Sequence, residues 1–122
     1  MIDELVNFKT AKLAKEKGFD ITSWFGNDAS LYDKEGTHVY YSNYGFMGSG
    51  LSENYIKAPT QSLLQRWLRE EHRLNVVPLP NRYDSDVWYY FIGSKKITEE
   101  DTNWTYEQAL EEGLQQALTL IN

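Results

Sequence analysis

The chain is 122 residues long, about the length of one compact domain, and it carries a formal net charge of −6. A hydrophobic fraction of 41% and a charged fraction of 25% are typical of globular proteins and exclude a disordered or collagen-like chain. The absence of Cys excludes a disulfide framework, a thiolate nucleophile and a cysteine-based metal site. We therefore expect a single domain over residues 1–122 that is built around a hydrophobic core.

The negative charge is concentrated at the C-terminal end. Residues 98–122 contain six of the 18 acidic residues and no Lys or Arg, so the rest of the chain is formally neutral. Net acidity argues against non-specific nucleic-acid binding, which depends on neutralising phosphates. The N-terminal residues lack the basic and apolar regions of a signal peptide, and no apolar run is long enough to cross a bilayer. We expect a cytoplasmic protein with no membrane partner.

The N-terminal part predicts a helix and then a hairpin. Asn7 is a favourable N-cap for a helix over residues 8–17, and Gly18 suits the position after it. Two segments rich in β-branched and aromatic residues follow, separated by turn-forming residues: 19–25 and 38–41. Residues 42–54 carry three glycines among Ser and Asn, which predicts a loop.

The motif Ala58-Pro59-Thr60-Gln61 predicts the start of a second helix, with Pro59 at its first position. One side of this helix is apolar at helical spacing and should be buried, and consists of Leu63, Leu64, Trp67 and Leu68. The other side alternates basic and acidic residues, and its basic members are Arg66, Arg69 and Arg73.

Two further strands and a final helix complete the prediction. Residues 75–79 form a strand, and Pro78 and Pro80 indicate that it is an edge strand or a short element. The aromatic strand 87–93 follows a turn. Thr105 and Gln108 form a capping box, after which apolar residues repeat every three or four positions to residue 121. Because a glycine costs a helix about 1 kcal/mol relative to Ala, Gly113 on this apolar stripe indicates that another part of the chain passes close by.

Residues 8–45 and 58–95 share the order helix, strand, turn and aromatic strand, at offsets of about 49 to 55 residues. Either an internal duplication or a chance similarity of pattern could account for this shared order. In either case the predicted fold is α+β, with the order αββ-αββ-α and the last helix at 104–121. We expect a roughly four-stranded, mainly antiparallel sheet with three helices packed on one face.

The chain offers little for catalysis. His38 and His72 lack the spacing of a zinc site, and the glycine-rich residues 45–50 lack the Lys of a phosphate-binding loop. Ser49 lacks the motif of a nucleophile elbow, and short acidic runs such as 99–101 are usually solvated. We therefore expect no catalytic, cofactor-binding or metal-binding residue and no cofactor. A small hydrolase would require an enclosed polar cleft near His38 or Asp84.

The sequence offers stronger candidates for a binding surface than for a catalytic site. Successive residues of a strand point to opposite faces, so neighbouring strand aromatics cannot all point toward the helices. The candidate interaction residues on strands are Tyr41, Trp88 and Tyr90. An aromatic face of this kind can bind a partner, pair with a second copy or be covered within the chain. A basic helix face with Arg66, Arg69 and Arg73 would instead suit nucleic acid.

Residues 58–72 read APTQSLLQRWLREEH, Tyr89-Tyr90 follow, and residues 105–114 read TYEQALEEGL. With these motifs the chain resembles a family of small uncharacterised proteins carried by phages and prophages of Bacteroides-type gut bacteria, and the resemblance covers most of its length. It implies a phage or prophage origin and a cytoplasmic setting, and no activity or catalytic residue.

Taken together, the sequence predicts a phage-derived accessory protein that is not an enzyme and that binds a protein partner or itself, as a homodimer. The alternative is a nucleic-acid-associated protein that uses the Arg and Lys residues of a helix face. A small hydrolase is the second alternative.

Overall fold

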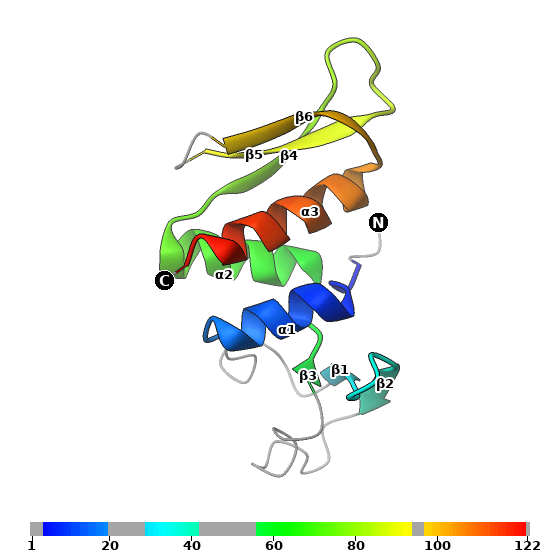
Figure 1. Cartoon of the computed structure of the whole chain (residues 1–122), viewed down its shortest axis with the longest axis vertical. Coiled ribbons are helices and arrows are strands. Elements are labelled where there is room, and N and C mark those ends of the chain that lie inside the picture. Colours follow the sequence, from blue (N-terminus) through cyan, green and yellow to red (C-terminus); the bar gives the residue numbers. More distant parts are fainter. Residues whose placement is uncertain (1–3, 20–28, 42–55, 94–96, 122) are drawn as a thin grey trace.

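The computed structural model describes residues 4–19, 29–41, 56–93 and 97–121, and confirms an α+β protein (Figure 1). The helices are α1 (Phe8–Glu16), α2 (Gln61–His72) and α3 (Tyr106–Thr119). The strands are β1 (Ala29–Tyr32), β2 (His38–Tyr41), β3 (Ile56–Lys57), β4 (Val76–Pro80), β5 (Trp88–Ile92) and β6 (Ile97–Trp104). The strand expected at 19–25 falls almost entirely outside the described residues, and the loop expected at 42–54 lies outside them.

The described strands form two antiparallel three-stranded sheets with the orders β2-β1-β3 and β4-β5-β6. The expected single sheet of about four strands is therefore not the arrangement of these residues. The helices lie between the two sheets, with α3 packed on β4 and β5 and α1 next to β3 (Figure 1). A helical layer has two sides, so each sheet can lie against a different side of it. β1 is central in one sheet and β5 in the other.

The helix starts follow capping chemistry, with one correction. Asn7 caps α1, and its side chain accepts the Thr10 N–H at 2.9 Å. Thr60 is the N-cap of α2, so Pro59 precedes the helix instead of opening it. The reason is that the Pro59 carbonyl accepts the Val6 N–H at 2.9 Å, which keeps this residue in an extended contact with the N-terminal segment.

The capping box predicted for α3 is present, because the Thr105 side chain accepts the Gln108 N–H while the Gln108 side chain accepts the Thr105 N–H. The apolar stripe of α3 is buried and forms the centre of the core together with β4, β5 and α2. At Gly113 an added Cβ would lie 2.7 Å from Val76 Cγ1 and 2.9 Å from Tyr90 Cβ. The close approach predicted at this glycine is therefore confirmed.

Candidate interaction surface

The sheet β4-β5-β6 has an inner face that meets α3. Tyr90 is 5% exposed and Ile92 is fully buried, and both belong to the core. The Trp88 ring lies against the ring of Tyr106 in the first turn of α3, with centroids 5.0 Å apart. Tyr90 also stacks on Trp104, with centroids 6.0 Å apart and an interplanar angle of 14°. Trp88 and Tyr90, which the sequence suggested as interaction residues, therefore point inward and pack the molecule together.

The opposite face of the same sheet is apolar and lies away from the helices. Because strand residues alternate, the residues between the inward ones point outward. The strand register pairs Val77 with Phe91 and Leu79 with Tyr89. Each of these four side chains is half-buried, and no described helix or strand lies on their side of the sheet (Figure 1). We call this surface the outer face, and it consists of Val77, Leu79, Tyr89 and Phe91.

The β4 edge of this sheet is closed to further strands. In an antiparallel strand, alternate residues direct both backbone groups to the same side. The Val76 carbonyl accepts a hydrogen bond from the Gln65 side chain of α2 at 2.6 Å, so Val76 directs its backbone away from β5. Pro78 and Pro80 share that direction and have no N–H to offer. The edge position predicted from the prolines is confirmed, and another strand could not pair normally with β4.

The connection between β4 and β5 carries a very exposed tyrosine. Tyr83 is 88% exposed, and the Arg82 guanidinium lies 6.0 Å from the centre of its ring. The Asn81 side chain accepts the Tyr83 N–H at 2.8 Å, and the Asp84 side chain accepts the Asp86 N–H at 3.0 Å. These bonds order the turn. Tyr83 therefore lies outside the outer face, on a well-defined projection.

The remaining strand candidate, Tyr41, ends β2 and pairs with Ala29 at the edge of the other sheet. The structure describes only the backbone of Tyr41.

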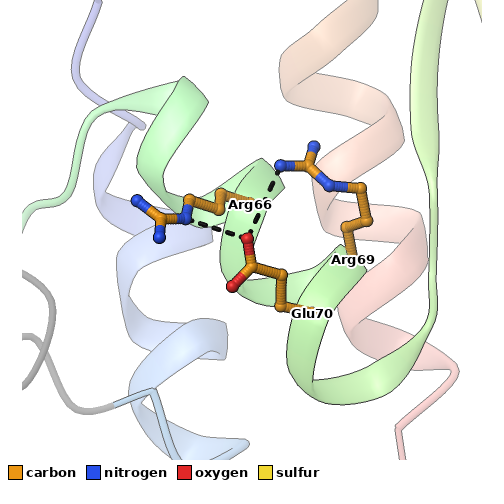
Figure 2. A network of polar contacts seen from close by, with 3 residues as sticks. All are labelled: Arg66, Arg69 and Glu70. Atoms are coloured by element: carbon orange, nitrogen blue, oxygen red, sulfur yellow. Dashed lines mark hydrogen bonds and ion pairs between the residues drawn. The ribbon is translucent and has the colours of Figure 1, made fainter.

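The basic residues of α2 are only partly available (Figure 2). Arg66 Nε lies 2.9 Å from a carboxylate oxygen of Glu70, and an Arg69 terminal nitrogen lies 3.9 Å from the same oxygen. The Arg66 and Arg69 side chains are 58% and 48% exposed, so water and salt weaken both ion pairs. Arg73 is exposed at the end of the helix, in the left-handed conformation with φ of 58°. Glu70 reduces the positive charge that this face could present to phosphates.

The two residues suggested for a hydrolase lie in different parts of the fold. His38 is exposed in β2, and Asp84 is exposed in the β4–β5 connection, on the other side of the helical layer (Figure 1). Residues 45–50, including Ser49, lie outside the described part of the chain. Among the residues that the structure describes, no group of three His, Asp or Glu side chains could hold a metal ion.

A partly buried polar cluster lies between the helices and links them by hydrogen bonds. The Glu111 carboxylate of α3 accepts the Asn7 N–H and a Gln61 side-chain N–H, each at 2.9 Å, and the Thr10 hydroxyl. Thr10 is fully buried and Gln61 is 3% exposed. All three donors are uncharged, so the carboxylate links α1, α2 and α3 without an ion pair from these groups. We refer to this set as the Glu111 cluster.

Tyr32 lies near the Glu111 cluster. Its hydroxyl donates to the Val6 carbonyl at 2.5 Å. Burial, with a smaller contribution from the negative charge of Glu111, raises the pKa of Tyr32 above its ordinary value of 10.0. The tyrosine is therefore held in its neutral form, which is the form that can donate this hydrogen bond.

Comparison with known proteins yields no match to any protein-family model, curated protein or solved structure. In the described part of the chain no helix is long and apolar enough to cross a membrane.

Proposed function

We propose that the chain is a non-enzymatic accessory protein that binds another protein surface through the outer face. The observation that carries this proposal is the group of four apolar side chains on a sheet face that no described element covers. Tyr and Phe on a rigid strand lose little conformational entropy on binding and are enriched at the centres of interfaces. A phage or prophage origin and a cytoplasmic setting stay predictions from the resemblance.

A protein partner suits this surface better than a nucleic acid. The outer face has no Lys or Arg, the side chains with which proteins neutralise nucleic-acid phosphates. The nucleic-acid alternative depends on Arg66 and Arg69, which share Glu70 as a partner. The hydrolase alternative would require an enclosed polar cleft near His38 or Asp84, and both residues are exposed.

Cysteine labelling tests whether the outer face is accessible, and the natural absence of Cys makes it specific. We would measure the rate at which a maleimide modifies Leu79→Cys in dilute protein. Tyr83→Cys provides the exposed reference, and Ala117→Cys the buried reference, since Ala117 is fully buried.

We expect the cysteine at position 79 to react within about tenfold of the rate at position 83, because a half-buried thiol on an open face meets the reagent without unfolding. A rate as slow as that at position 117 would show that the face is covered within the chain, and the proposal would be wrong.

A further inference from the structure

We propose that the N-terminal part of the chain is a cover that opens as one unit from the rest of the molecule, which stays folded. The cover consists of the described residues from 4 to 57, with α1 and the sheet β2-β1-β3. The base consists of the described residues from 58 to 121, with α2, α3 and the sheet β4-β5-β6. The proposal does not depend on the outer face, which belongs to the base and lies on the far side of its sheet (Figure 1).

The cover and the base each have their own internal contacts. In the cover, the Phe8 ring of α1 packs against the Tyr32 ring of β1, with centroids 5.6 Å apart. The turn between β1 and β2 lies on the same Phe8 ring, because a Cβ added at Gly36 would be 3.0 Å from Phe8 Cδ2. In the base, buried residues of α2, α3, β4 and β5 form most of the described core. The base therefore keeps most of its packing when the cover leaves.

The cover contributes little apolar area to that core. The residues that α1 buries are small: Thr10, Ala11 and Ala14. In the described core that cover and base share, Val6 is the one larger apolar side chain of the cover that is fully buried, while Leu13 and Phe19 are partly buried. Hydrophobic stabilisation grows with the apolar area removed from water. Separating the cover should therefore cost less free energy than unfolding the base.

Hydrogen bonds at both ends of α1 fasten the cover to α3. At the start of α1, the Glu111 carboxylate accepts the Asn7 N–H and the Thr10 hydroxyl. At the end of α1, the Lys17 ammonium donates to the Ile121 carbonyl at 2.7 Å. The carboxylate thus lies at the positive end of the α1 dipole, and the ammonium lies at the negative end of the α3 dipole. We call these two sets of contacts the clasps.

The N-terminal segment adds two backbone hydrogen bonds between cover and base. The Val6 N–H donates to the Pro59 carbonyl at 2.9 Å, and the Gln61 N–H donates to the Glu4 carbonyl at 2.7 Å. Residues 59 and 61 immediately follow the point where the chain passes from the cover to the base. These two bonds can therefore break while the chain bends at this point, without disturbing the sheet of the base.

Opening would uncover the side of α2 that the cover protects. Trp67 of α2 is only 5% exposed, and the Phe19 ring of the cover lies against it, with centroids 5.2 Å apart. When the cover opens, Phe19 leaves and the Trp67 ring meets solvent. The clasps then control how often this second apolar surface is available for binding.

Hydrogen exchange of the full chain, followed by mass spectrometry in urea below the unfolding transition, tests the proposal. After correction for intrinsic rates, the amides of α1 should exchange at least about tenfold faster than the slowest amides of α3 and β5. Their rates should also rise less steeply with urea, because opening exposes less surface than unfolding. Equal rates with equal urea dependence in the cover and the base would overturn the proposal.

Ile92→Val distinguishes an opening cover from a single cooperative unit. Ile92 is fully buried in the base, and the loss of one carbon should speed exchange in β5 by about two- to tenfold. The base stays folded when the cover opens, so the exchange rates in α1 should not change. A rise in α1 equal to that in β5 would mean that cover and base unfold together, which contradicts the proposal.

Lys17→Met tests the clasps, because it removes the ammonium and keeps an apolar side chain of similar helix propensity. Exchange in α1 should become about three- to tenfold faster. Lys9→Met is the matched control at an exposed position of the same helix, and it should change the rates by less than about twofold. Far-UV circular dichroism establishes that each variant is folded. Equal rates in the two variants would show that the clasp does not hold the cover, and the proposal would be wrong.

Discussion

Replacing Gly113 with Ala tests how α3 packs on the sheet β4-β5-β6. In an exposed helix the change would stabilise the protein by about 1 kcal/mol, because Ala is the better helix former. Here the new methyl would lie 2.9 Å from Tyr90 Cβ and 2.7 Å from Val76 Cγ1. Tyr90 Cβ is attached directly to the backbone of β5, so the strand must move, and overpacking of this kind costs about 1–3 kcal/mol.

The overpacking cost exceeds the helix-propensity gain over most of its range. We therefore expect Gly113→Ala to lower the free energy of unfolding by up to about 2 kcal/mol and the melting temperature by up to about 10 °C. Urea and thermal unfolding, followed by far-UV circular dichroism and Trp fluorescence, measure both quantities. Glu112→Gly and Glu112→Ala, at the exposed neighbouring position, give the propensity difference within the same helix. A Gly113→Ala protein about 1 kcal/mol more stable than the wild type would refute the packing argument.

Three further predictions concern the helix ends and the Glu111 cluster. Glu111→Gln should lower the free energy of unfolding by about 1–3 kcal/mol at neutral pH, because one amide oxygen cannot accept from all the donors that the carboxylate serves. Glu112 is exposed, so the control Glu112→Gln should change the free energy of unfolding by less than about 0.5 kcal/mol. Urea unfolding measures both values. Arg73→Gly should raise the free energy of unfolding by about 0.5–1 kcal/mol, since Gly accepts a φ of 58° without strain, and a lower value would contradict this cause. The raised pKa of Tyr32 means that this hydroxyl loses its proton at lower pH in the unfolded chain than in the folded one, so the free energy of unfolding falls as the pH rises above about 10. Tyr32→Phe lacks the hydrogen bond to Val6 and should be less stable at neutral pH. When unfolding is measured at several pH values, its free energy of unfolding should fall less steeply above about pH 10 than that of the wild type.

The helices were the most predictable part of the fold. Thr105 and Gln108 predicted the capping box of α3, and Asn7 predicted the N-cap of α1. Both signals are local, because a capping side chain bonds to the backbone only two or three residues away. The prediction that Pro59 is the first residue of α2 was wrong, because the Pro59 carbonyl accepts a hydrogen bond from the Val6 N–H. This contact joins segments that are far apart in the sequence, so the local pattern could not indicate it.

The strands were harder for two physical reasons. Residues 97–104 contain Glu99, Glu100 and Asp101, which have low β-propensity, so the pattern did not indicate β6. Its place in the sheet comes from pairing with β5. The division of the strands into two sheets depends on which side of the helical layer each strand lies. The pattern of residues within a strand does not indicate that side.

The candidate surface was predicted in kind but not in its residues. An aromatic face turned away from the helices was expected, yet Trp88 and Tyr90 point inward, while Tyr89 and Phe91 point outward. Residues 88–91 are all aromatic, so the strand's own pattern is the same in either phase. The neighbouring strand β4 carries part of the information on which aromatic residues share a face. Pro78 and Pro80 occupy alternate positions and so lie on the same face of β4, and the register places Pro78 opposite Tyr90.

Solvent exposure of individual methyl groups is the most direct test of the claim that the outer face is open. In dilute protein, a soluble paramagnetic probe should relax the NMR signals of the Val77 and Leu79 methyls strongly, and those of Val76 and Ile92 weakly, because Val76 and Ile92 are fully buried. Val76 and Val77 are adjacent and chemically identical, so their difference isolates the direction in which each side chain points. Equal protection of the two valines would contradict the assignment of the outer face and, with it, the proposed interaction surface.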